Sequence, residues 1–209
     1  MMPPIPILVP VDGRWLAACY ANGRGEYLIR AAFADQTILF DPIPLSGLGS
    51  VHVTDGGRIF ATNWANNRSY AGEWTTAGFV PVPSDIAELI DVAADGSVQL
   101  VKIGRDVDLF DGPTLLRTLP PDPAAVSTLP KAISADGSVV AGFSRSPTGR
   151  EWPVVWRRND LPVPLSTGAW TNAESTALSA DGRTVAGIVF EADGSLRAAV
   201  WVDGTGPFF

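Results

Sequence analysis

The sequence has little of the chemistry on which many enzymes and metal sites depend. Its 209 residues include one cysteine, Cys19, and one histidine, His52. A single cysteine excludes an internal disulfide. One cysteine and one histidine also cannot form a Cys/His metal cluster, and the chain carries neither a Ser/His/Asp set nor a phosphate-binding loop motif. The sequence therefore predicts no metal and no cofactor.

Positive net charge and long apolar runs are also missing. The formal net charge of −7 argues against general affinity for nucleic acid or anionic membranes, because both attract basic surfaces. The apolar start, residues 1–11, has no basic segment and contains Pro3, Pro4, Pro6 and Pro10. We expect a strand there, not a signal peptide or a membrane span, which leaves the cytoplasm as the default compartment.

What the sequence does contain is a repeat. An Asp-Gly pair recurs at spacings of 43, 40, 41 and 45 residues. The five pairs are Asp12-Gly13, Asp55-Gly56, Asp95-Gly96, Asp136-Gly137 and Asp181-Gly182. Repeats of about 40 to 50 residues with several short strands are typical of β-propellers. The 21 glycines and 18 prolines agree with many tight turns.

Each repeat predicts four antiparallel strands. A short apolar segment precedes Asp-Gly, and a second one follows it, as in residues 138–142 and 183–187. Asp accepts hydrogen bonds from nearby amides and Gly adopts positive φ, so we interpret the pair as a hairpin turn, not a calcium ligand set. The Ala-Gly pair that closes both second strands is expected to let neighbouring sheets approach closely.

An aromatic residue ends each expected third strand at a similar offset from its Asp. The five are Phe33, Trp74, Phe110, Trp156 and Trp201, at 21, 19, 15, 20 and 20 residues. Recurrence in every unit favours burial over a sugar platform. Fourth strands with prolines suit outer edges. We therefore predict an all-β, five-bladed β-propeller in a single domain, residues 1–209, with approximate blades 5–45, 46–85, 86–120, 121–165 and 166–209.

The last two units carry a family resemblance. Residues 133–142 read ISADGSVVAG, residues 178–187 read LSADGRTVAG, and residues 199–201 read AVW. These segments resemble the HAF-type repeats of bacterial, often extracellular, proteins. Units one to three keep the Asp-Gly and aromatic positions but lose the flanking frame. The resemblance implies a bacterial propeller, often at the cell surface or secreted, and it implies no catalytic residues.

Ligand contacts are expected on the loops between second and third strands and between blades, because these gather on one face of a propeller. Arginines occur in four of these loops: Arg24, Arg68, Arg105 and Arg145. Arginine forks suit carboxylate, phosphate or sulfate, so an anion-binding rim is one hypothesis. The alternative is that exposed loops simply carry solvated charge.

Aromatic residues outside the repeat frame offer a second hypothesis for this face. Trp64 lies near Asn66, and Trp170 lies near Asn172. An aromatic plane with neighbouring amides can stack on a sugar ring and hydrogen-bond to it. Either tryptophan could equally be packed against its own blade.

An enzyme is the contrasting hypothesis. Some five-bladed propellers are glycoside hydrolases with a carboxylate pair near the axis. The first strands supply Asp91, which would need a loop acid such as Glu88 or Glu174. His52 occupies a position that is apolar in the other repeats, so a hydrogen-bonded core histidine is favoured over a catalytic base.

The sequence thus favours a non-catalytic recognition module that binds a glycan, an anionic group or a protein on its loop face. A hydrolase and a purely structural segment of a larger surface protein are the alternatives.

Overall fold

The protein is described from a computed structural model. The structure describes residues 5–7, 16–21, 27–33, 36–39, 47–75, 77–157 and 161–209, with side chains from residue 49 onward. These residues form β-strands and turns and contain no helix, and hence none that could cross a bilayer.

The strands are arranged in five four-stranded antiparallel sheets, each built from four consecutive strands. The first sheet contains β1 (Ile5–Ile7), β2 (Leu16–Ala21), β3 (Tyr27–Phe33) and β4 (Gln36–Leu39). The second contains β5 (Gly47–Val53), β6 (Ile59–Ala65), β7 (Arg68–Thr75) and β8 (Gly78–Pro81). The third contains β9 (Ala87–Val92), β10 (Gln99–Ile103), β11 (Asp106–Asp111) and β12 (Thr114–Thr118).

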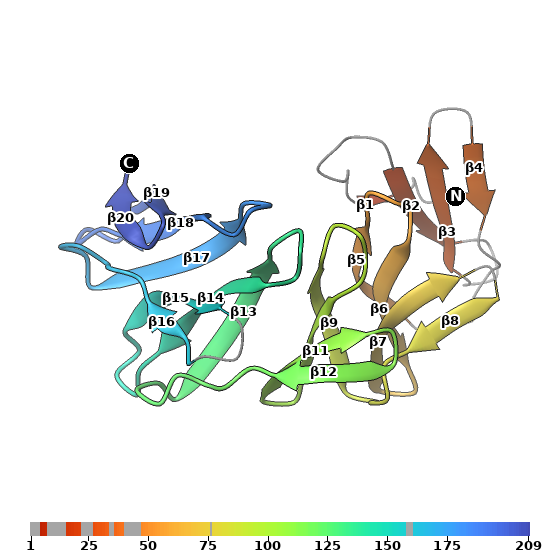
Figure 1. The fold of residues 1–209 in the computed structure, drawn as a ribbon, viewed down its shortest axis with the longest axis horizontal. Coiled ribbons are helices and arrows are strands. Elements are labelled where there is room, and N and C mark those ends of the chain that lie inside the picture. The colour runs from red at the N-terminus through yellow and green to blue at the C-terminus, as the bar shows by residue number, and fades with distance from the viewer. Residues whose placement is uncertain are drawn as a thin grey trace.

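The fourth sheet contains β13 (Ser127–Ile133), β14 (Val139–Arg145), β15 (Glu151–Arg157) and β16 (Val163–Pro164). The fifth contains β17 (Asn172–Leu178), β18 (Thr184–Phe190), β19 (Leu196–Val202) and β20 (Thr205–Phe208). Figure 1 shows the sheets following one another in an arc, from β1–β4 to β17–β20. The first strands β5, β9, β13 and β17 lie beside one another in turn, so they form the inner wall, and the fourth strands form the outer edges.

The four described Asp-Gly pairs lie in hairpin turns between first and second strands, as predicted, and Asp12-Gly13 lies outside the described residues. Asp136 Oδ1 accepts the amide hydrogen of Ser138 at 3.0 Å, and Gly137 has φ 71°. The hydrogen bond from the Ser134 hydroxyl and those from Ser138 lower the pKa of Asp136. In the second sheet the Asp55-Gly56 pair lies one position earlier in the turn, so the positive φ falls on Gly57.

The same turns also tie neighbouring sheets together. The Asp55 amide donates to the Ala94 carbonyl, the Ala94 amide to Ala135, and the Ala135 amide to Ala180, at 2.9 to 3.0 Å. Backbone hydrogen bonds thus run from turn to turn across four sheets. The repeat therefore fixes the packing of sheets as well as the hairpins.

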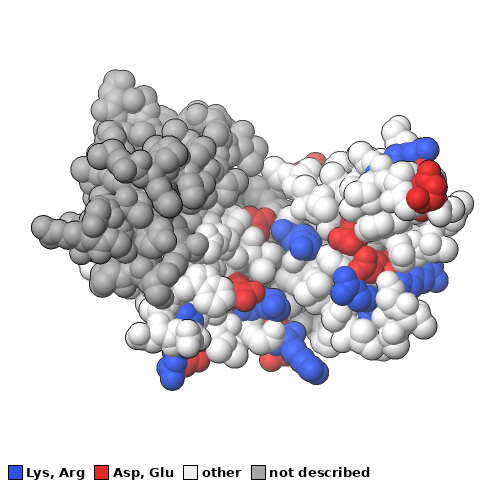
Figure 2. Space-filling model, turned by 180° about the vertical axis from the view of Figure 1, so that it is seen from behind, with Lys and Arg blue, Asp and Glu red and all other residues white. Residues whose placement is uncertain are grey.

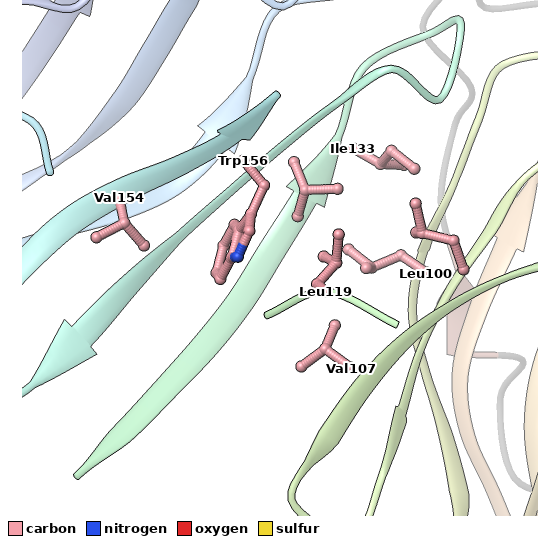
Figure 3. Packing of buried hydrophobic residues seen from close by; sticks show 8 residues of the cluster. Leu100, Val107, Leu119, Ile133, Val154 and Trp156 are labelled. Atoms are coloured by element: carbon pink, nitrogen blue, oxygen red, sulfur yellow. The ribbon is translucent and has the colours of Figure 1, made fainter. Parts of the chain in front are cut away.

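Apolar side chains fill the space between adjacent sheets. Trp74, Phe110, Trp156 and Trp201 are all buried, which confirms their predicted role in packing; the Phe33 side chain lies outside the described residues. Figure 3 shows Trp156 and Val154 of the fourth sheet facing Leu100 and Val107 of the third.

Each of the two buried indoles in the last sheets is fixed by a linker carbonyl. The Nε1 of Trp156 donates to the Pro120 carbonyl at 2.9 Å, and that of Trp201 donates to the Ser166 carbonyl at 2.7 Å. A buried N–H needs such a partner. The tryptophans therefore anchor the segments that connect one sheet to the next.

The prediction for the Ala-Gly pairs holds for Ala141, which is buried in the cluster between the fourth and fifth sheets, but was wrong for the glycines. A Cβ on Gly142 would lie 2.2 Å from the Leu129 carbonyl oxygen, and one on Gly187 would lie 1.9 Å from that of Glu174. Both obstacles are in the first strand of the same sheet, where a β-bulge shifts the register. Glycine is needed because the bulged backbone comes close, not because neighbouring sheets approach.

Candidate functional site

One end of the sheets collects the β-turns between second and third strands and the linkers between sheets. We call it the loop face; it includes the described turns at residues 66–67, 104–105, 146–150 and 191–195 and the linkers at residues 82–86, 119–126 and 165–171. The Asp-Gly turns lie at the opposite end, because strand direction alternates within each sheet.

A cavity of about 780 Å³ opens between the third and fourth sheets at the loop face. We call it the inter-sheet cavity. The β10–β11 hairpin lines it on one side, and the linker and the start of β13 line it on the other. Val107, Leu119 and Trp156 form its apolar floor; all three are part of the buried cluster drawn in Figure 3.

The linker wall of this cavity is held in place by Asp122. Its side chain accepts hydrogen bonds from the Ala124 amide at 2.9 Å and from the Trp152 indole at 3.0 Å. Its own amide donates to Thr128 Oγ1 at 3.1 Å. Asp122 is only 5% exposed. Asp122 therefore fixes the Pro120–Pro123 segment.

Basic side chains lie at the mouth of the cavity. Arg105, exposed in the β10–β11 turn, lines it together with Lys102. No described residue forms a hydrogen bond or an ion pair with the Arg105 guanidinium, and Lys102 reaches Glu88 only at 3.5 Å. Asp106 adds one acidic group. The entrance therefore combines a cation available for a ligand with an apolar interior.

Two other arginines of the predicted rim form ion pairs with acidic neighbours. Arg68 forms an ion pair with Asp85, and Arg145 forms one with the buried Glu151. Arg24 lies outside the described residues. Figure 2 shows basic groups lying beside acidic ones over the face in view. The described arginines of the predicted rim thus do not converge into one basic surface.

The predicted sugar platform at Trp170 is covered by other side chains of this protein. Trp170 donates its Nε1 hydrogen to Glu191 at 3.1 Å, and its ring centroid lies 4.5 Å from that of Phe209. Asn172 Oδ1 accepts the Glu151 amide hydrogen at 3.0 Å. Trp170 is thus packed on its own sheet, which was the alternative interpretation.

The second platform, near the end of β6, is more open. Trp64 is 40% exposed, and Asn66 occupies the following turn with φ 52°. Asn tolerates this left-handed conformation better than other non-glycine residues. The turn itself therefore explains Asn66.

The three carboxylates of the enzyme hypothesis lie on inner strands. Glu88 belongs to β9 and Glu174 to β17, so their prediction as loop acids was wrong. Asp91 accepts the Ile133 amide hydrogen at 2.9 Å and lies 3.2 Å from the His52 Nδ1. It therefore connects the inner strands of three sheets. His52 is half-buried beside Asp91 and not in the core, so the predicted core position was wrong.

A carboxyl pair that the sequence did not suggest lies where the fourth and fifth sheets meet at the loop face. Burial and a hydrogen bond to Glu151 raise the pKa of Glu174 to about 7. Arg145 in turn forms an ion pair with Glu151. Glu174 therefore takes up or releases its proton near neutral pH. The two residues belong to different sheets and are not neighbours in the sequence, so no sequence pattern indicates the pair.

Within the described residues, no group of three or more His, Cys, Asp or Glu side chains is placed to hold a metal ion. The same part of the chain brings Asp91, Glu88 and Glu174 to three different neighbourhoods, next to His52, Lys102 and Glu151 respectively. These residues do not assemble into one catalytic group.

Solved structures with the same arrangement of sheets are β-propellers. The β-propeller domain of the Trilobed protease from Pyrococcus furiosus, described as having an open velcro topology, aligns with TM-score 0.68 and 13% identity over 97% of this chain and 68% of its own. A putative TolB from Agrobacterium tumefaciens aligns with TM-score 0.62 and 16% identity over 97% and 78%. This chain has the β-propeller fold. At these identities the likeness shows the fold alone.

TolB from Acinetobacter baumannii also matches, with TM-score 0.59 and 14% identity, over 98% of this chain. The chain spans 55% of that protein's length. No protein-family model matches the sequence, and no curated protein matches it.

Proposed function

We propose that this protein is a five-bladed β-propeller that acts as a non-catalytic recognition module and binds its ligand in the inter-sheet cavity of the loop face. The five four-stranded sheets support the blade count. Within the described residues, each sheet uses four consecutive strands, and no strand is exchanged between the first and last sheets.

The observation that carries the proposal is the inter-sheet cavity itself. Its volume of about 780 Å³ lies within the range of roughly 300 to 1,000 Å³ that is usual for ligand pockets. It joins an apolar floor to a few polar groups at the mouth, which is the usual composition of such sites. Asp122 fixes one wall, so the shape exists before a ligand arrives.

Recognition is favoured over hydrolysis by the placement of the carboxylates. Glycosidases keep their two carboxyl groups roughly 5 to 9.5 Å apart so that a sugar or water fits between them. Glu174 interacts directly with Glu151, and Glu151 is ion-paired with Arg145. Asp91 already lies beside His52 and accepts the Ile133 amide hydrogen.

A protein ligand is favoured over a glycan because Trp170 and Asn172 already have partners in this chain. For the compartment, the HAF-type resemblance favours a bacterial surface or secreted protein. The net charge of −7 argues against nucleic acid as the partner. A purely structural role remains the alternative that the following experiment tests.

The test compares two neighbouring alanines. Ala125 lines the inter-sheet cavity, whereas Ala124 lines a different hollow of about 410 Å³ next to Trp152. Ala124 is exposed and Ala125 is half-buried, so circular dichroism first checks that both tryptophan variants are folded. Wild type, Ala125→Trp and Ala124→Trp are used to select from a phage-displayed random peptide library and to probe a glycan array.

We expect wild type and Ala124→Trp to retain the same ligands and Ala125→Trp to lose them. Retention of every ligand by Ala125→Trp would place binding elsewhere. A wild-type protein that selects nothing from either collection would support the purely structural role.

A further inference from the structure

The inter-sheet cavity has two chemically distinct parts. Val107, Leu119 and Trp156 at its floor are 6%, 3% and 1% exposed. An apolar side chain that covers this floor is removed from water, which favours its binding. The interior therefore selects for an apolar group.

The mouth selects for negative charge. Arg105 has no hydrogen-bond or ion-pair partner among the described residues, and Lys102 is held only loosely by Glu88 at 3.5 Å. A guanidinium offers a planar fork of donors that matches a carboxylate. The acidic Asp106 in the same turn disfavours a ligand that carries several negative charges.

The wall offers backbone groups to an extended chain. β13 is an edge strand of its sheet and pairs only with β14. Its first residues, 127–129, line the cavity, so the edge opposite β14 lies outside the sheet's hydrogen-bond ladder. Extended peptides add to such edges through main-chain hydrogen bonds, and a lipid or a sugar has no matching set.

We propose that the inter-sheet cavity binds an extended peptide segment of a partner protein that carries an apolar side chain beside a carboxylate. The apolar side chain enters over Leu119 and Trp156, the carboxylate pairs with Arg105, and the peptide backbone follows residues 127–129. This inference rests on the proposed function and specifies its ligand.

The test reverses the charge at the mouth. The random peptide library is selected on wild type, on Arg105→Glu and on the control Arg183→Glu. Arg183 is also exposed, but lies by an Asp-Gly turn at the opposite end of the sheets and pairs with Asp203. The dissociation constant of the leading wild-type peptide is then measured on all three proteins at low and high salt.

Wild type is expected to enrich peptides with Asp or Glu next to Leu, Ile or Phe. Arg105→Glu should weaken the leading peptide by about tenfold or more, since like charges repel, and should select peptides with Lys or Arg instead. Arg183→Glu should stay within about twofold of wild type. High salt should weaken wild-type binding and reduce the difference between the proteins.

Two results would overturn the inference. One is enrichment of peptides that lack carboxylates, and the other is equal binding by wild type and Arg105→Glu. If those peptides are still lost in Ala125→Trp, recognition at the cavity stands and only the ligand chemistry is wrong. If Ala125→Trp keeps them, both proposals fail.

Discussion

At the scale of single residues, the turn glycines serve two purposes that can be separated. Gly137 and Gly149 both have positive φ, at 71° and 84°. A Cβ on Gly137 would lie 2.6 Å from Val98 of the preceding sheet, whereas one on Gly149 would meet nothing within 4 Å. The first glycine is needed for both conformation and packing, and the second for conformation alone.

We therefore expect Gly149→Ala to lower the free energy of unfolding by about 1 kcal/mol through backbone strain. Gly137→Ala should lower it by roughly 2 to 4 kcal/mol, because overpacking adds to the strain. Urea denaturation followed by tryptophan fluorescence measures both. Equal losses in the two variants would contradict the packing role of the Asp-Gly turn.

The Glu174–Glu151 pair makes stability depend on pH. Burial and the hydrogen bond to Glu151 raise the pKa of Glu174 from 4.5 to about 7 in the folded protein. The folded state therefore binds the proton more tightly than the unfolded chain. The resulting stabilisation is fully present below pH 4.5 and is lost as the pH rises through about 7.

Glu174→Gln imitates the protonated group at every pH. The difference in unfolding free energy between this variant and wild type should therefore grow in favour of the variant between pH 4.5 and 7 and level off above that. Glu88→Gln, on another inner-strand carboxyl, paired with Lys102, is the matched control for removing one negative charge. A flat difference for Glu174→Gln would show that the pKa of Glu174 is not raised in the folded protein.

At the scale of elements, polar contacts along the inner strands join the sheets. Asp91 on β9 contacts His52 on β5 and the Ile133 amide on β13. Ser50 on β5 donates to the Leu89 carbonyl on β9 at 2.6 Å, and Ser175 on β17 donates to the Gly142 carbonyl on β14. Polar contacts from the inner strands thus join each pair of neighbouring sheets from the second to the fifth.

Asp91→Ala should lower the free energy of unfolding by about 2 to 3 kcal/mol, because the Ile133 amide and His52 lose a charged acceptor. Asp91→Asn keeps an acceptor oxygen and should lose less. Thermal unfolding monitored by circular dichroism distinguishes the variants. If Asp91→Ala unfolds at the wild-type temperature, the contact across the three sheets does not contribute to stability.

The strand pattern was the most predictable element-scale feature. Fourth strands with prolines were predicted at the outer edges, and β8 (Gly78–Pro81) and β16 (Val163–Pro164) are such edge strands. The alternation of apolar and polar residues, the turn residues and the edge prolines are local signals, so they can be recognised without tertiary information. The bulges opposite Gly142 and Gly187 were missed, because they depend on pairing between strands.

At the scale of the whole molecule, each sheet is complete in four consecutive strands, and neighbouring sheets are stabilised mainly by the apolar layers between them. In such repeat architectures stability is approximately a sum over repeats and their interfaces. The ends of the chain are therefore the positions at which a deletion removes one defined part.

Deletion of residues 1–11 removes β1, the strand that pairs with β2 at the inner edge of the first sheet. We expect loss of a single cooperative transition in calorimetry, since the first sheet then lacks its inner strand. A truncated protein with unchanged thermal stability would contradict the assignment of residues 5–45 to one blade.

The sequence by itself determined the repeat, the turns and the buried aromatic positions, because a hairpin turn and an alternating strand are set by residues close together in the chain. Only the tertiary structure decided which loop residues are available to a ligand. Arg68, Arg105 and Arg145 look alike in the sequence, but Asp85 and Glu151 neutralise two of them and leave Arg105 beside the inter-sheet cavity. That outcome depends on contacts between distant side chains, which no local pattern encodes.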